Sequence, residues 1–317
     1  MDRILEGIRV VDMTQYLSGP TVTRMMAEMG ADIVKVEQPP GGDPSRRYAI
    51  LHRETGRSGY FVQQNRGKRS LCVDFNDPRG REIIGELIDE ADVLVENFGP
   101  GVLARRGFDW EPLRKRNPRL IMAAISGFGR DSAWSDRTAF DLTAQAVSGV
   151  MYMTGPEDGP PMATGSATAD VVSGVHAVAA IGYALFHRER TGRGQFIDIA
   201  MVDCLFHTHE FAIQGPSLTG LRWKPTRHGH RSKVNTPLGS YRGPQGWLAI
   251  QAMEAQFPRL AEAMGAPELA DDLRFSTLDA RVANRDVLNQ MIEDWMAGFD
   301  TDQEILEALD EARVPSA

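Results

Sequence analysis

Cysteine and positive charge are both scarce in this sequence. The two cysteines, Cys72 and Cys204, lie far apart and in no known motif, so neither a disulfide framework nor a zinc site is indicated. The 35 lysines and arginines are outnumbered by 43 acidic residues, and the resulting net charge of −8 argues against nucleic-acid binding as the main function. A local group of arginines could still bind an anionic ligand.

Long hydrophobic runs are missing as well. The N-terminus lacks an apolar core of signal-peptide length, and no uninterrupted apolar run approaches the ~20 residues that span a bilayer. We therefore expect a cytoplasmic protein with no membrane partner. The composition, 42% hydrophobic and 25% charged over 317 residues, is typical of a globular protein with two domains, or with one large domain and an appendage.

The first half of the chain alternates short apolar segments with segments of helical periodicity, such as 21–29 and 76–90. The predicted strands are 8–13, 31–37, 70–74, 92–96 and 119–125, with one more at 196–199. Because parallel strands need crossover connections, this alternation predicts an α/β fold with an open, mostly parallel, Rossmann-like sheet. Ligands bind beyond the carboxyl ends of the strands in such folds. The loops to examine follow Met13, Glu37, Glu96 and Ile125.

The second half is predicted to begin with helices at 140–153 and 170–189. We expect a large α/β domain over residues 1–213, a linker rich in Gly, Pro, Arg and His over 214–235, and a small α+β domain over 236–317. The elements predicted in the small domain are a hairpin of strands 238–242 and 247–251 and helices at 255–264, 284–296 and 302–312.

Common catalytic and nucleotide-binding motifs are absent. The glycine-containing segments 41–43 and 127–129 lack the spacing of a phosphate loop or a dinucleotide turn. His207 and His209 lie two residues apart in a predicted helix, so they point to different faces and make a poor metal pair. No serine lies in a nucleophile-elbow context, and a serine hydrolase is therefore not indicated.

The segment 92–107 combines a strand with a turn that could hold an anion. The strand ends in Asn97-Phe98-Gly99-Pro100-Gly101, and a short helix then brings Arg105 near. The turn could offer backbone N–H groups, a ring and a guanidinium to a phosphorylated ligand. An ordinary strand–helix connection with a solvated arginine explains the same pattern.

Asp170 stands at the beginning of the long predicted helix, within 165–174. Read by its position alone, it is an N-cap or first-turn residue favoured by the helix dipole. The same dipole would keep the carboxylate ionised, as a nucleophilic carboxylate requires. The segment 187–195, by itself, is a basic helix end followed by a glycine cap.

These segments, in this order, resemble the class III CoA-transferases, the family of formyl-CoA transferase and carnitine CoA-transferase. The resemblance covers residues 4–215 and, more loosely, the rest of the chain. The matching segments are Leu5–Val10, Ser18–Pro20, Gly30–Glu37, Lys68–Leu71, Glu96–Gly101, Ser126–Gly129, Ala169–Asp170 and Arg190–Gln195.

The resemblance implies that Asp170 is the catalytic nucleophile. Its carboxylate would attack an acyl-CoA thioester to give a mixed anhydride, and the CoA thiolate would then form an aspartyl-CoA thioester. A small organic acid would accept CoA by the reverse steps. No cofactor or metal beyond CoA itself is implied, and an interlocked homodimer is expected.

The same resemblance places Asp141 near the reacting groups and implies a set of CoA-binding residues. These are Leu17, Ser18, Gln38, Val73, Asp74, Phe75, Asn76, Asn97, Phe98, Gly99 and Arg105. The formyl-CoA transferases have Gln, Arg and Lys where this chain has Leu17, Gln38 and Asn76, and their glycine-run loop is missing, the nearest segment being 238–247. Oxalate and formate are therefore less expected than succinyl-CoA with another small organic acid.

Two alternatives stay open at this point. The related α-methylacyl-CoA racemases use a histidine base in a Gly-His-Asp triplet, but here the triplet is Ala139-Phe140-Asp141, and phenylalanine cannot accept a proton. A catalytically impaired CoA-binding member is the other alternative. Family members run several tens of residues further, so their returning C-terminal segment is absent from this sequence, and the chain is expected to be truncated or incomplete.

Overall fold

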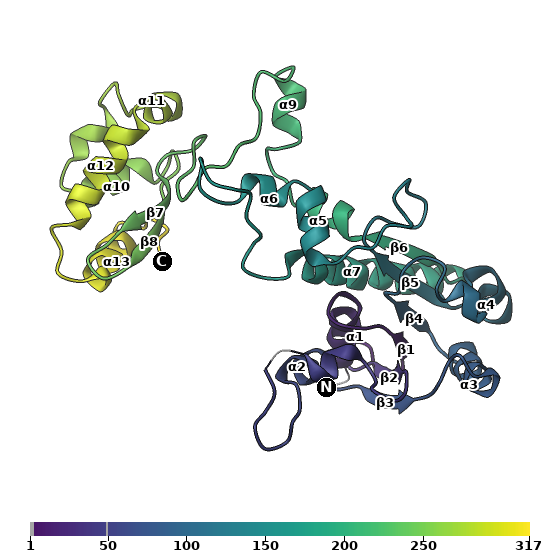
Figure 1. Ribbon diagram of the computed structural model, residues 1–317. Coiled ribbons are helices and arrows are strands. Elements are labelled where there is room, and N and C mark those ends of the chain that lie inside the picture. The colour runs from purple at the N-terminus through teal and green to yellow at the C-terminus, as the bar shows by residue number, and fades with distance from the viewer. Residues whose placement is uncertain (1–2, 49) are drawn as a thin grey trace. The chain divides into compact units, whose positions relative to one another are not determined.

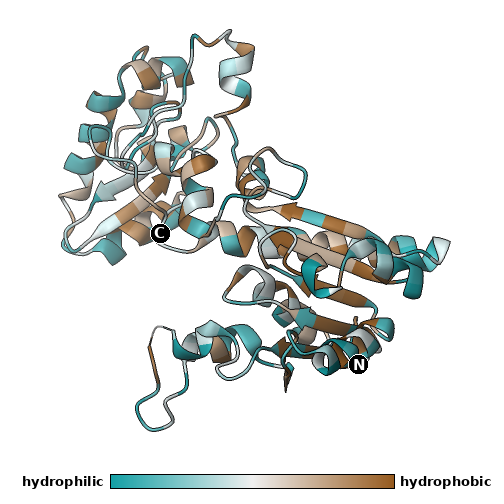
Figure 2. Ribbon diagram, turned by 45° about the vertical axis from the view of Figure 1, so that its right-hand side comes forward, coloured by the Kyte–Doolittle hydropathy of each residue, from teal (hydrophilic) through white to brown (hydrophobic). Residues whose placement is uncertain are grey.

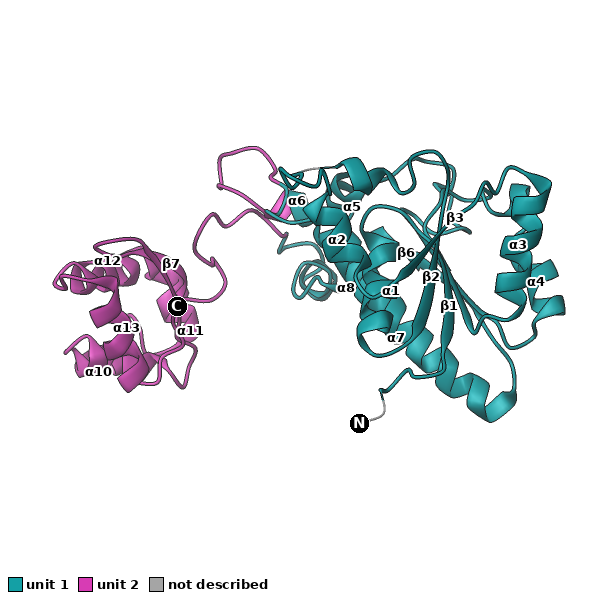
Figure 3. Cartoon of the chain, turned by 90° about the horizontal axis from the view of Figure 1, so that it is seen from below, with its two compact units in different colours: residues 1–151, 163–224 teal, residues 152–162, 225–317 magenta. Residues whose placement is uncertain are grey.

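The computed structural model describes residues 3–48 and 50–317, and its chain divides into two compact units (Figure 3). The large unit comprises Met1–Met151 and Ala163–Lys224. The small unit comprises Tyr152–Met162 and Pro225–Ala317. The segment Tyr152–Met162 therefore belongs with the C-terminal part of the chain, although it precedes the longest helix.

The large unit is built on a six-stranded sheet in which all pairings are parallel. Its strands are β1 (Arg9–Met13), β2 (Asp32–Glu37), β3 (Arg69–Cys72), β4 (Val93–Glu96), β5 (Ile121–Ser126) and β6 (Phe196–Ala200). The order β3-β2-β1-β4-β5-β6 confirms the predicted open, Rossmann-like sheet. The chain reverses its direction of travel between β1 and β4, and such a switch point is where open α/β sheets bind ligands.

Helices cover both faces of this sheet (Figure 1). One face carries α1 (Ser18–Glu28) and α7 (Thr168–Thr191), whose Val22 and Ile181 join the buried cluster of β1, β4 and β5. The other carries α3 (Pro78–Asp89) and α4 (Trp110–Arg116). The central strands β1, β4 and β5 are strongly hydrophobic (Figure 2), as expected for parallel strands that are buried on both sides.

The predicted helix at 140–153 is interrupted in the structure. It forms α5 (Asp141–Val147) and α6 (Val150–Met153), separated at Gly149, whose φ of +88° a continuous helix cannot contain. Other short helices were not predicted from the sequence, and α9 lies inside the segment predicted as a linker. These are α2 (Gly59–Asn65), α4, α9 (Gln214–Leu218) and α11 (Leu278–Ala283), whereas α8 (Met201–His207) corresponds to the helix predicted around His207.

The small unit contains the predicted hairpin and helices. Strands β7 (Leu238–Arg242) and β8 (Trp247–Gln251) pair antiparallel. The helices are α10 (Phe257–Ala263), α11, α12 (Arg285–Met296) and α13 (Asp302–Glu311). Tyr241, Phe275 and Leu288 are fully buried in a separate core, which explains why this part forms a compact unit of its own.

Among the described helices, α7 alone has the length and apolar composition that could cross a membrane. Within the large unit its Ala177 and Ile181 are buried against α1 and the sheet. Its outward side leaves large apolar side chains exposed, notably Val175, Tyr183 and Phe186. Packing therefore accounts for one side of its hydrophobicity, and an uncovered apolar face remains.

Candidate active site

A cavity of about 520 Å³ lies in the large unit where the loops after β1, β4 and β5 meet the first turn of α7. It occupies the switch point of the sheet. Six residues predicted from the family resemblance line it together: Ser18, Asn97, Phe98, Gly99, Arg105 and Asp170. The structure thus brings the turn after β4 and the predicted nucleophile to one cavity.

Asp170 is the third residue of α7, in its first turn but not at its N-cap. The residue in the N-cap position, Ala167, has no side chain able to cap. Instead the Asp141 carboxylate accepts hydrogen bonds from the backbone N–H groups of Ala169 at 2.7 Å and Asp170 at 3.3 Å. Asp141 therefore takes the free N–H groups and the favourable end of the helix dipole.

The surroundings of Asp170 work against its ionisation, but they do not overcome it at neutral pH. Burial raises the pKa of the Asp170 carboxyl, the neighbouring Asp141 carboxylate raises it further, and a hydrogen bond from the Ser18 side chain opposes them, leaving a pKa of about 6. A carboxyl with this pKa is still about nine-tenths ionised at pH 7. The group is thus a carboxylate at neutral pH, but a more basic one than an exposed aspartate.

The Ser18 hydroxyl is itself held in place by Asn97. The Asn97 amide donates to Ser18 Oγ at 3.1 Å and makes two hydrogen bonds of 2.8 Å with the backbone N–H and C=O of Gln15. Ser18 is only 4% exposed, at the beginning of α1. The Ser18 hydroxyl is therefore fixed on the wall of the cavity that Asp170 also lines, where it favours the ionised form of Asp170.

Asp141 is held by a separate set of polar groups. Gln145, which is buried one turn further along α5, donates from Nε2 to Asp141 Oδ2 at 2.7 Å. Its Oε1 accepts from the N–H of Thr164 at 2.9 Å. Asp141 does not line the cavity, so its position suits it to cap α7 and to influence Asp170 by its charge.

The remaining predicted residues lie outside the cavity. Gln38 donates to Asp74 Oδ1 at 2.5 Å, and the same oxygen accepts from the N–H of Asn76 at 2.8 Å. This cluster, with Phe75, lies at the carboxyl ends of β2 and β3, and the Phe75 ring meets Phe98 of the cavity with centroids 6.0 Å apart. Leu17 is buried before α1, and Val73 is half-buried after β3.

Several residues that line the cavity were not predicted as site residues. They are Gln15, Tyr16, Pro100, Val102, Ile125, Ser126, Gly127, Asp136, Arg137, Thr138, Ala139, Phe140 and Met201. Gln15, Tyr16, Ser126 and Gly127 follow β1 and β5, so the strand-end rule could have found them. Arg137 and Met201 carried no local signal, because tertiary folding alone brings them to the cavity.

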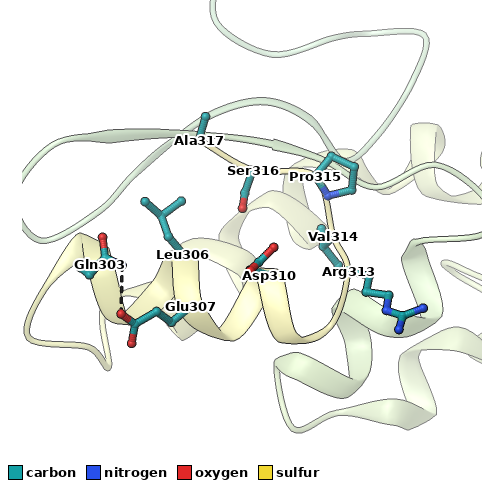
Figure 4. A pocket seen from close by; sticks show the side chains of 9 residues that line it. All are labelled: Gln303, Leu306, Glu307, Asp310, Arg313, Val314, Pro315, Ser316 and Ala317. Atoms are coloured by element: carbon teal, nitrogen blue, oxygen red, sulfur yellow. Dashed lines mark hydrogen bonds between the residues drawn. The ribbon is translucent and has the colours of Figure 1, made fainter.

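A second cavity, of about 510 Å³, lies within the small unit between α13 and residues 313–317 (Figure 4). None of the predicted site residues lines it. Within residues 3–48 and 50–317 no group of three or more His, Cys, Asp or Glu side chains could hold a metal ion. His207 bonds to His176 at 2.8 Å, while His209 lies beyond α8.

Comparisons with known proteins agree with one another. The sequence model of a family described as CoA-transferase family III matches residues 5–317. The chain is 38% identical to the formyl-CoA:oxalate CoA-transferase of Streptomyces avermitilis and 40% identical to the succinyl-CoA:mesaconate CoA-transferase of Haloarcula hispanica, each over 99% of this chain and 80% and 79% of the relative. A CAIB/BAIF family protein from Brucella suis superposes with a TM-score of 0.86 at 36% identity, over 100% of this chain and 84% of that one.

Proposed function

Since this chain belongs to CoA-transferase family III, we propose that it moves CoA from an acyl-CoA to a carboxylic acid through covalent intermediates on Asp170. The observation that carries the proposal is the placement of this one carboxylate. It lies in the cavity lined by Asn97, Phe98 and Arg105, and at neutral pH it is ionised but unusually basic.

The transfer proceeds in four exchanges at carbonyl carbons. An Asp170 oxygen attacks the thioester carbonyl, the C–S bond breaks, and a mixed anhydride and the CoA thiolate form. The thiolate attacks the aspartyl carbonyl of the anhydride, so the donor acid leaves and an aspartyl-CoA thioester remains. The acceptor carboxylate attacks the carbonyl of this thioester, so CoA thiolate leaves and a second mixed anhydride forms. The thiolate then attacks the acyl carbon of the acceptor in this anhydride. The new acyl-CoA leaves, Asp170 is again a carboxylate, and no net proton is consumed.

Trapping the covalent intermediate tests the proposal. Incubation with an acyl-CoA and hydroxylamine should convert Asp170 to a hydroxamate, because hydroxylamine attacks the activated aspartyl carbonyl of the anhydride or thioester. Peptide mass spectrometry locates the modified residue. The same incubation without acyl-CoA is the control. A hydroxamate on another residue, or none at a time when transfer is measurable, would exclude Asp170 as the nucleophile.

The pH dependence of transfer should report the environment of Asp170. Only the carboxylate attacks, and burial with the Asp141 charge raises its pKa to about 6. We therefore expect kcat/KM to fall about tenfold for each pH unit well below pH 6. An exposed aspartate would show this loss only near pH 4. A profile that stays level down to pH 5 would contradict the raised pKa.

The substrates that the site suits are acyl-CoA esters of dicarboxylic acids. Arg105 and Arg137 line the cavity, and guanidinium groups bind phosphates and carboxylates in two-pronged geometry. The acids in the two relatives' names, oxalate and mesaconate, are dicarboxylic, and one donor is succinyl-CoA. We expect succinyl-CoA to serve as donor, which a panel of donors against mono- and dicarboxylic acceptors would establish. CoA also extends along Leu17, Gln38 and the segment 73–76, with no further cofactor.

The exposed face of α7 suits a homodimer. Val175, Tyr183 and Phe186 are 45%, 76% and 64% exposed, and large exposed apolar side chains on one helix are typical of an interface. An interlocked dimer would cover them, and sedimentation analysis would reveal it. The two cysteines, of which Cys204 is buried, fit a cytoplasmic protein.

A further inference from the structure

The loop between β1 and α1 has an unusual backbone at the edge of the cavity. It places Gln15, Tyr16 and Ser18 on the cavity wall. Tyr16 has a φ of +62°, in the left-handed region that bulky side chains other than glycine rarely adopt. Such a conformation persists only where surrounding contacts hold it.

A buried ion pair beneath the loop supplies these contacts. Lys35 and Asp43 are 1% and 2% exposed, and Lys35 Nζ lies 3.0 Å from Asp43 Oδ2. The same ammonium donates to the backbone C=O of Thr14 at 2.7 Å. The other carboxylate oxygen of Asp43 accepts from the N–H of Tyr16 at 3.3 Å and from that of Ser45 at 2.9 Å. The ion pair therefore hydrogen-bonds to the loop on both sides of Gln15, at Thr14 and at Tyr16.

These hydrogen bonds have a direct consequence for the nucleophile. Ser18 follows Tyr16 by two residues, lines the same cavity as Asp170, and lowers the pKa of that carboxyl through its side chain. If Tyr16 relaxed to a negative φ, the chain direction into α1 would change and Ser18 would turn away. We propose that Asp43, paired with Lys35, is a positioning residue that holds Tyr16 left-handed and so keeps the Ser18 hydroxyl beside Asp170 on the cavity wall. This inference rests on the proposed function of Asp170.

Other ionisable groups face Asp170 from the surrounding elements and bear on how a test is read. Asp141 approaches from α5, and the charge of Asp170 is also felt by Tyr60 of α2. Arg105, Asp136 and Arg137 line the same cavity. None of these groups contacts the Tyr16 N–H, so substitutions at Tyr16 and Asp43 alter the loop and leave these charges in place.

Two substitutions at Tyr16 separate backbone conformation from side-chain loss. Tyr16→Asn and Tyr16→Val both remove the ring, but asparagine tolerates a left-handed φ and a β-branched residue does not. The pH below which kcat/KM falls is called the acid limb here. In Tyr16→Val the acid limb should move up by about one pH unit, because a carboxylate that loses a charge-assisted hydrogen bond has a pKa higher by about that amount. In Tyr16→Asn the limb should stay at the pH of the unaltered protein.

Asp43→Asn tests the ion pair of Lys35 and Asp43 itself, with Asp92→Asn as matched control. Asp92 also faces a buried cation, because Arg188 Nη1 lies 2.9 Å from its carboxylate, but it precedes β4 at the far end of the sheet. Both variants should unfold at lower temperature, whereas only Asp43→Asn should shift the acid limb upward. Ser18→Ala removes the hydroxyl directly and should shift the acid limb by itself. The double variant Ser18→Ala, Asp43→Asn should therefore have the same acid limb as Ser18→Ala alone.

The outcomes distinguish this inference from the function on which it rests. An unshifted acid limb in folded Asp43→Asn, in Tyr16→Val or in Ser18→Ala overturns the inference and leaves CoA transfer intact. If Asp43→Asn does not fold, the comparison of Tyr16→Val with Tyr16→Asn tests the inference by itself. Absence of both transfer and hydroxamate in the unaltered protein would instead overturn the proposed function.

Discussion

Asp170→Ala should lower kcat for CoA transfer by about four orders of magnitude, because the covalent route disappears with its nucleophile. The surrounding donors cannot substitute for it, since Ser18 and Asn97 only hydrogen-bond to each other and to neighbouring groups. The measurement is steady-state transfer from succinyl-CoA to a dicarboxylic acid, together with hydroxamate formation, which should vanish.

Asp136 supplies the matched control, because it is another carboxylate on the wall of the same cavity. Asp136→Asn should keep transfer within about tenfold of the unaltered protein.

CoA affinity, measured by calorimetry, should change little in Asp170→Ala. Arg105→Ala should instead raise KM for the CoA ester and leave kcat unchanged if its guanidinium meets a phosphate. Near-complete loss in Asp136→Asn with survival of Asp170→Ala would exchange the roles of the two aspartates.

The fold was predictable because its signals are local and repeated. The central strands of the sheet are short apolar runs such as Val93–Glu96, and the crossover through α3 has helical periodicity. The hairpin of β7 and β8 was found with its bounds because four turn residues, 243–246, separate two strand-like runs. The helix 140–153 was wrong because periodicity continues across Gly149, while the backbone there does not.

The site was predictable only in part, for a different reason. Asp170 and the turn at Asn97 lie in segments whose order resembles a known family, so both could be named before the fold was known. The environment of Asp170 could not, because it depends on Asp141, 29 residues away in sequence, which takes the N–H groups that position alone would assign to Asp170. The contribution of Asp43 likewise comes through Lys35 and a single positive φ.

Asp12→Ala should lower the free energy of unfolding of the large unit by about 3–5 kcal/mol, because it leaves a buried ammonium without its partner. Asp12 is fully buried in β1, and its carboxylate lies 3.0 Å from Lys68 Nζ. Burial would raise the pKa of Asp12, but Lys35, Lys68 and two threonine hydroxyls lower it to about 2. Because the folded pKa is depressed, this contribution to stability is present above pH 4 and is lost as the pH falls toward 2.

A double substitution distinguishes an unpaired charge from a lost contact. Burial lowers the pKa of Lys68 to about 8 despite the opposing charge of Asp12, which shows how costly that ammonium is to bury. Asp12→Asn combined with Lys68→Met should therefore recover most of the stability lost in Asp12→Asn alone. Hydrogen exchange of the β1 and β2 amides measures the stability of the single and the double variant. The control is Asp32→Asn, which breaks the exposed pair with Arg69 and should lower the free energy of unfolding by under about 1 kcal/mol. A double variant as unstable as the single one would mean that Asp12 acts through Thr14 and Thr23, which it also bonds, and not through the ion pair.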